Sequence, residues 1–84
     1  PNPFNSQIVL PINLDVESEA AVLRLYGALG NPVRTFLLGS LPRGSHRITW
    51  DGTDDQGRQV ASGRYLAMLK AGSLTRSRPL TLVR

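Results

Sequence analysis

Cysteine is absent from this chain of 84 residues, which excludes disulfide bonds and thiolate metal sites. No apolar run approaches the ~20 residues of a membrane-spanning helix, and no basic-plus-apolar signal peptide opens the chain. A chain of this length has room for one small core. We therefore expect a single domain over residues 1–84, and the opening PNPFN, which is not a plausible natural start, indicates a piece cut from a longer protein.

Aromatic and acidic residues are scarce. Aromatic residues make up 6% of the chain, and six Asp and Glu residues face ten Lys and Arg residues, a net charge of +4. Residues 43–84 carry eight basic residues against three aspartates, or +5, whereas residues 1–42 carry two basic residues against three acidic ones, or −1. Nucleic-acid-binding surfaces combine basic residues with aromatic stacking platforms, and these are not interleaved here. We therefore expect no nucleic-acid partner and interpret the excess charge as a solvated basic face.

Alternation of apolar and polar residues dominates what is present, and no helical period is sustained. Turn residues separate the alternating segments at roughly the 8–12-residue spacing of antiparallel sandwiches. The sequence therefore predicts an all-β, antiparallel sandwich of about seven short strands. The residues expected to face inward are Ile8, Leu10, Ile12, Leu14, Ala21, Leu23, Leu25, His46, Ile48, Trp50, Tyr65, Ala67, Leu69, Leu80 and Leu82.

Three local features refine this expectation. Pro11 and Pro79 cannot donate a ladder hydrogen bond, which places their strands at a sheet edge or at a bulge. Residues 36–38 are consecutive apolar residues, which indicates a bulge or a strand covered on both faces. In the turn at residues 28–32, Gly30 and Asn31 are the residues able to adopt positive φ.

The segment HRITWDGTDDQGRQVASGRY crowds three aspartates and three glycines next to the only tryptophan. A helix–loop–helix calcium loop needs a glycine at its sixth position and a glutamate at its twelfth. Counted from Asp51, Gly57 falls seventh and no glutamate stands twelfth. We therefore predict a long turn whose aspartates accept hydrogen bonds from local backbone donors, with calcium binding at residues 51–57 as the open alternative.

Catalytic candidates are few. Ser45 and His46 are neighbours in a predicted strand, so their side chains point to opposite faces and cannot form a nucleophile–base pair. Asp54 and Asp55 share one turn, which is a poor mount for rigid acid–base geometry. We therefore predict a non-enzyme with no catalytic residues, cofactor or metal. Trp50 alternates with Ile48 and is expected in the core.

Four stretches together resemble a known family: PNPFNSQIVLPINL, LRLYGALGNPVRTF, RGSHRITWDGTDDQGRQVASGRYLAML and RPLTLVR. They resemble the small immunoglobulin-like (Ig-like) domain of flagellar hook-capping proteins, a FlgD-like domain. Equally, they resemble the type A C-terminal sorting domain of proteins exported by the type IX secretion system. The resemblance covers essentially the whole chain. It implies an Ig-like sandwich with these residues as determinants of the fold: Trp50, Asp51, Gly52, Asp54, Gly57, Val60, Gly63 and Tyr65.

Resemblance to the sorting domains implies that this is the C-terminal domain of a larger multidomain protein, and it implies a function as well. It predicts a non-catalytic sorting or anchoring module that directs its parent protein through the periplasm to the bacterial cell surface. Its partners would be secretion or surface-attachment proteins, together with an upstream catalytic or adhesive domain of the same chain. Many such domains end in a lysine-containing strand, whereas this chain has arginine there. The implied recognition residues are Pro1, Asn2, Pro3, Phe4, Gly63, Tyr65, Arg78, Leu80, Leu82, Val83 and Arg84.

Two alternatives remain open. The first is a structural Ig-like spacer or assembly module, as in the hook cap. The second is a carbohydrate-binding module that uses Trp50 or Tyr65, which requires an exposed tryptophan. Exposed edge strands also make a homodimer formed by edge-strand pairing physically reasonable.

Overall fold

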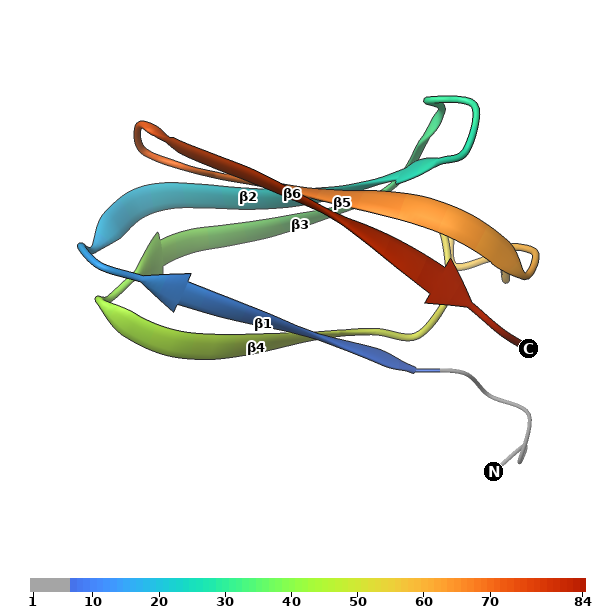
Figure 1. Ribbon diagram of the computed structural model, residues 1–84, viewed down its shortest axis with the longest axis horizontal. Coiled ribbons are helices and arrows are strands. Elements are labelled where there is room, and N and C mark those ends of the chain that lie inside the picture. Colours follow the sequence, from blue (N-terminus) through green and yellow to red (C-terminus); the bar gives the residue numbers. More distant parts are fainter. Residues whose placement is uncertain (1–6) are drawn as a thin grey trace.

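Six β-strands form two antiparallel sheets that lie one above the other in the computed structural model, which describes residues 7–84 (Figure 1). The strands are β1 (Ile8–Leu14), β2 (Ser18–Gly27), β3 (Pro32–Leu41), β4 (Gly44–Trp50), β5 (Gly63–Ala71) and β6 (Leu74–Leu82). β1 and β4 form one sheet, and the other has the order β3-β2-β5-β6. The predicted all-β sandwich is confirmed, with six strands in the described residues where about seven were expected. Within those residues, no helix is long and apolar enough to cross a membrane.

The core lies between the two sheets and follows the predicted alternation. On β1, Leu10, Ile12 and Leu14 are buried, whereas the residues between them are exposed. Trp50 closes the core at the end of β4 with none of its surface exposed. The buried apolar residues are Leu10, Ile12, Leu14, Ala21, Leu23, Leu25, Val33, Trp50, Ala67, Leu69, Ala71, Leu80 and Leu82. Each strand therefore turns one face inward, as the period of two requires.

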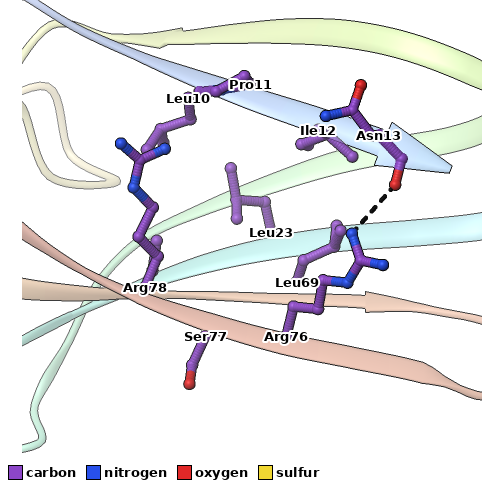
Figure 2. A pocket seen from close by; sticks show the side chains of 10 residues that line it. Leu10, Pro11, Ile12, Asn13, Leu23, Leu69, Arg76, Ser77 and Arg78 are labelled. Carbon is purple, nitrogen blue, oxygen red and sulfur yellow. Dashed lines mark hydrogen bonds between the residues drawn. The ribbon is translucent and has the colours of Figure 1, made fainter.

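Both prolines that indicated sheet edges lie on edge strands. Pro11 is in β1, whose pairing among the described residues is with β4 alone, and Pro79 is in β6, which pairs with β5. An edge strand leaves one side of its backbone unpaired, so a missing N–H costs little there. The same two strands flank an open side of the sandwich (Figure 2).

The predicted irregularity of β3 is a β-bulge. Ala21 of β2 pairs with Gly39, and the next residue, Val22, pairs with Leu37, so Leu38 is one extra residue on β3. The bulge lets Leu38 pack against the core while Leu37 stays 80% exposed.

In the turn between β2 and β3, Gly30 adopts the positive φ that was expected there, with a value of 84°. Asn31 does not, because no non-glycine residue in the described range has positive φ. Instead, the carbonyl of Asn31 accepts a hydrogen bond of 2.8 Å from the backbone N–H of Gly27, which closes the turn. A single glycine in the left-handed region is thus sufficient for this connection.

Candidate functional site

The acidic segment at residues 51–62 connects β4 to β5 and is fixed to the core by two aromatic side chains. Trp50 donates from its indole nitrogen Nε1 to the carbonyl oxygen of Thr53 over 2.8 Å. Tyr65 stands edge-on to Trp50, with ring centroids 5.2 Å apart and an interplanar angle of 71°. Its hydroxyl donates to the carbonyl oxygen of Ala61 over 2.5 Å. The prediction that Trp50 is a core residue is confirmed, and the exposed tryptophan that a carbohydrate-binding surface would need is not there.

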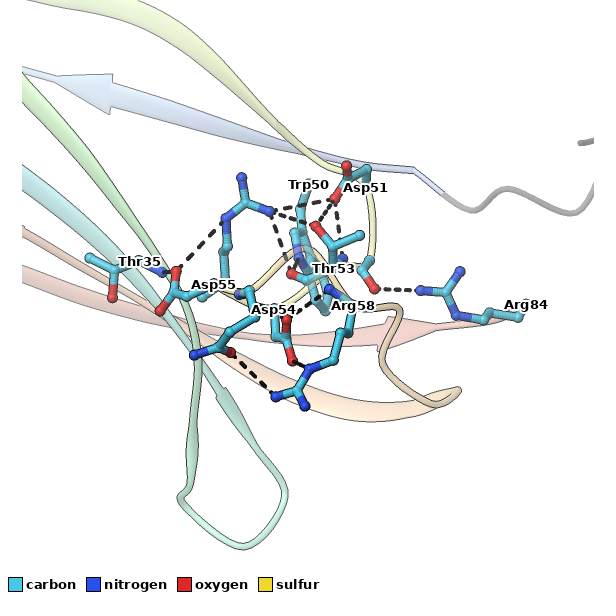
Figure 3. A network of polar contacts seen from close by, with 11 residues as sticks. Thr35, Trp50, Asp51, Thr53, Asp54, Asp55, Arg58 and Arg84 are labelled. Carbon is cyan, nitrogen blue, oxygen red and sulfur yellow. Dashed lines mark hydrogen bonds and ion pairs between the residues drawn. The ribbon is translucent and has the colours of Figure 1, made fainter. Parts of the chain in front are cut away.

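The aspartates of this segment accept hydrogen bonds from nearby backbone donors (Figure 3). Asp51 Oδ1 accepts from the N–H of Thr53 over 3.1 Å and from its hydroxyl over 2.5 Å. Asp54 Oδ1 accepts from the N–H groups of Gln56 and Arg58 over 3.0 and 2.9 Å. The predicted turn function of these carboxylates is confirmed. In residues 7–84 no group of three or more His, Cys, Asp or Glu residues could hold a metal ion, so calcium binding gains no support.

Arg34 of β3 ties the acidic segment to the four-stranded sheet. Its Nη1 donates to the hydroxyl of Thr53 over 2.7 Å and lies 3.5 Å from Asp51 Oδ1. The guanidinium also lies over the ring of Phe36, 4.7 Å from its centroid, in a cation–π contact. Asp55 Oδ1 adds a second link to β3, because it accepts from the N–H of Thr35 over 2.9 Å. Sequence reasoning missed Arg34, because this residue is remote from the segment along the chain and no local pattern links the two.

Arg84, the last residue, closes the other side of the segment. Its Nε donates to the carbonyl oxygen of Val60 over 2.6 Å, its Nη2 donates to the carbonyl oxygen of Gly52, and its backbone N–H donates to Ser62 Oγ over 3.0 Å. We call these contacts the Arg84 latch. Gly52 has a φ of 78° and leaves room for the guanidinium, because a Cβ atom there would lie 2.6 Å from Nη2. The latch therefore requires glycine at position 52.

The local hydrogen bonds lower the pKa of two carboxyl groups below the usual 3.8. For Asp51, the hydroxyl of Thr53 is the largest cause of the lowered pKa, and Arg34 adds a coulombic contribution. For Asp54, the largest cause of the lowered pKa is the backbone N–H of Arg58. A carboxyl group whose pKa is lower in the folded state stabilises the fold above its unfolded-state pKa, and that contribution is lost as the pH falls through the folded-state pKa.

We therefore expect the urea midpoint of the domain to fall on acidification below about pH 4, measured by tryptophan fluorescence over a pH series. The variant Asp51→Asn should show a shallower fall, because it lacks one of the two groups. Glu17→Gln removes an exposed carboxyl outside the segment and serves as the control. An Asp51→Asn profile parallel to that of the unmodified domain would contradict this assignment.

His46 and Ser45 are engaged by different partners, as their opposite directions predicted. His46 is half-buried, and its Nε2 lies 2.7 Å from the carbonyl oxygen of Pro42. Ser45 Oγ donates to Asn13 Oδ1 across the β1–β4 pair over 2.7 Å. Neither residue is therefore placed to activate the other.

The residues implied as recognition elements are spread between the core and the surface. Leu80 and Leu82 are buried in the core, whereas Arg78 and Val83 are exposed. Tyr65 and Gly63 are half-buried at the start of β5, and Arg84 forms the latch. The predictions for Pro1, Asn2, Pro3 and Phe4 lie outside the described residues. A partner that binds the folded domain can therefore contact Arg78 and Val83 but not the side chains of Leu80 and Leu82. That these residues are recognised by a partner stays a prediction.

The chain is similar to FlgD in both sequence and structure. The family described as the FlgD Ig-like domain matches residues 5–74. Among solved structures, the crystal structure of FlgD from P. aeruginosa matches with a TM-score of 0.75 and 25% sequence identity. The match covers 92% of this chain and 60% of that one, so this chain spans less than two thirds of the FlgD structure. No curated protein matches.

Proposed function

The chain belongs to the FlgD Ig-like domain family, and we propose that it is a non-catalytic structural and assembly module of a larger protein. In this role it spaces and connects neighbouring parts of its parent, including a catalytic or adhesive domain upstream. Its dimensions, 36 × 29 × 21 Å, set the length of the spacer it provides. Strand addition at free sheet edges, including pairing between two copies, is one way in which such a module contributes to assembly.

The observation that carries this proposal is that the polar segment at residues 51–62 serves the fold itself. The carboxylates of Asp51, Asp54 and Asp55 accept hydrogen bonds from backbone donors in the segment or in β3. Arg34 and Arg84 bind the same segment from two sides. Carboxylates of a catalytic or metal site converge on a point that is open to a ligand, whereas Asp51 and Asp55 flank the guanidinium of Arg34 and Asp54 pairs with Arg58.

Domain replacement tests the proposal. Residues 1–84 are replaced in the parent protein by an unrelated Ig-like domain of similar size, or are deleted. A spacer role predicts that deletion disturbs assembly of the parent, measured by light scattering, and that the unrelated domain restores it. A role in specific assembly predicts restoration only by this domain. An assembly state that is unchanged by the deletion would overturn the proposal.

A second candidate is the sorting or anchoring module, which directs its parent through type IX secretion to the cell surface and binds secretion or surface-attachment proteins. The observation that favours it is the position of β6. This last strand lies at the edge of the four-stranded sheet and exposes Arg76 and Arg78. An edge strand presents unpaired backbone groups that a partner strand can use.

Export of a reporter separates the two candidates. Residues 1–84 are fused to the C-terminus of a periplasmic fluorescent protein in a bacterium with type IX secretion, beside a version without Leu80–Arg84. Because that deletion removes two core leucines and the Arg84 latch, the domain's resistance to protease is measured in each fusion. Arg78→Gln, which leaves the core intact, is a third fusion. If the intact fusion is exported and the truncated fusion is not, the sorting function is supported. If the intact fusion is folded but stays in the periplasm, the sorting function is contradicted.

A further inference from the structure

A groove opens between β1 and β6 on the open side of the sandwich (Figure 2). Leu10–Asn13 of β1 form one wall and Arg76–Arg78 of β6 form the other. Leu23, Ala67 and Leu69, which belong to the core, form the floor. The groove therefore ends on core side chains between two edge strands, and the leucines of its floor keep only 3–6% of their surface exposed.

Two arginines stand on the inward face of β6. Leu80 and Leu82 of this strand are buried, and the period of two carries the same face back to Arg78 and Arg76. The pairing of β6 with β5 supports this inward orientation. Arg78 lies opposite Ala67 and Arg76 lies opposite Leu69, and Ala67 and Leu69 are core residues. The inward face of β6 thus carries leucines near the C-terminal end of the strand and arginines where the strand borders the groove.

The two guanidinium groups differ in what they bind. Arg76 Nη1 donates to the carbonyl oxygen of Asn13 over 3.2 Å and so bridges the two sheets (Figure 2). Arg78 is exposed and has no hydrogen-bond or ion-pair partner among residues 7–84, and in Figure 2 it extends toward Leu10. No Asp or Glu lines the groove. The groove lining therefore carries a positive charge that no acidic side chain of the lining balances.

The size and lining of the groove limit what can occupy it. Its volume of about 270 Å³ is below the range of typical small-molecule pockets. No aromatic side chain lines it, so it offers no stacking platform for a sugar or a nucleobase. Four residues of β1 extend over about 10–13 Å, which matches a few residues of an extended peptide. Apolar side chains of such a peptide fit the floor, and a carboxylate complements Arg78 through a planar, bidentate pair.

We propose that this groove binds an extended peptide segment of another polypeptide, in which a carboxylate residue stands beside apolar residues. The carboxylate pairs with Arg78, and a neighbouring apolar side chain fills the groove against the small exposed part of Ile12 and Leu69. This inference rests on the proposed assembly function and specifies the chemistry of its partner. Because the groove is flanked by two edge strands, the bound segment can also use their unpaired backbone groups.

A peptide of alternating valine and glutamate, capped at both ends and carrying a neutral fluorophore, is the probe. Fluorescence anisotropy with residues 1–84 should show saturable binding, and NMR amide shifts should concentrate on β1 and β6. Arg78→Gln is expected to weaken binding by about tenfold, because a charge-assisted bond is lost. Arg78→Lys should restore part of the affinity, since it keeps the charge but not the planar fork.

Arg24→Gln is the matched control, because Arg24 is an exposed arginine of β2 between two inward-facing leucines and so lies on the opposite face of the sheet. It should change the affinity by less than about twofold. The inference is overturned by the absence of saturable binding, by equal losses in Arg24→Gln and Arg78→Gln, or by equal affinity for a peptide with glutamine in place of glutamate. None of these results alters the domain-replacement test of the assembly function. The peptide-binding inference and the assembly function can therefore fail separately.

Discussion

Replacement of Trp50 by alanine is expected to lower the free energy of unfolding by about 3–5 kcal/mol, measured by urea titration. Trp50 is among the largest side chains with no exposed surface, so its removal leaves a cavity between the sheets. The variant also loses the edge-on contact with Tyr65 and the hydrogen bond to the carbonyl of Thr53. A domain of this size has a total stability of about 5–10 kcal/mol, so Trp50→Ala should be largely unfolded in mild urea.

A second substitution separates volume from hydrogen bonding at this position. Trp50→Phe keeps most of the apolar volume but leaves the carbonyl of Thr53 without its indole donor, so a smaller loss of about 1–3 kcal/mol is expected. Leu29→Ala is the control, because Leu29 is 96% exposed and its loss should change stability by no more than about 0.5 kcal/mol. A loss below about 1 kcal/mol in Trp50→Ala would show that the tryptophan does not anchor the core.

Gly52→Ala is expected to lower the free energy of unfolding by about 2–4 kcal/mol, again in urea. Two causes act together. An alanine at a φ of 78° occupies the left-handed region, which costs about 1–2 kcal/mol. Its Cβ would also lie 2.6 Å from Nη2 of Arg84, so the guanidinium must leave the carbonyls of Gly52 and Val60.

Gly57 provides a matched control for the first cause. Its φ is 81°, but nothing lies within 4 Å of a Cβ built there, so Gly57→Ala should show the backbone cost alone, about 1–2 kcal/mol. In an Arg84→Ala background the collision is gone, and Gly52→Ala should then cost about as much as Gly57→Ala. Equal costs of Gly52→Ala with and without Arg84 would show that the latch does not constrain this turn.

Alternation predicted which residues face the core because the period of a strand is a local property. It placed Leu23 and Leu25 inside, and Trp50 inside through its spacing from Ile48. The same alternation failed at Phe36, Leu37 and Leu38, and this failure located the bulge. Proline chemistry identified edge strands for an equally local reason, the missing N–H group.

Pairing between strands could not be predicted in this way. The two-residue period of a strand indicates which of its faces is buried but not which other strand pairs with it. The β1–β4 and β2–β5 pairs are therefore known only from the structure. The contacts of Arg34 and Arg84 with the acidic segment were missed for the same reason. The inward position of Arg78 was within reach, since counting back by two from Leu82 and Leu80 arrives at it.

The pairing order also has a consequence for synthesis of the chain on the ribosome. β2 lies between β3, which follows it directly, and β5, which emerges only after β4. A nascent chain that ends before Gly63 can form the β2–β3 hairpin and the β1–β4 pair, but one edge of β2 stays unpaired until β5 is made. Exposed edges of this kind promote association with other chains. The interval between the emergence of β4 and that of β5 from the ribosome is therefore a stage at which this domain benefits from protection by a chaperone.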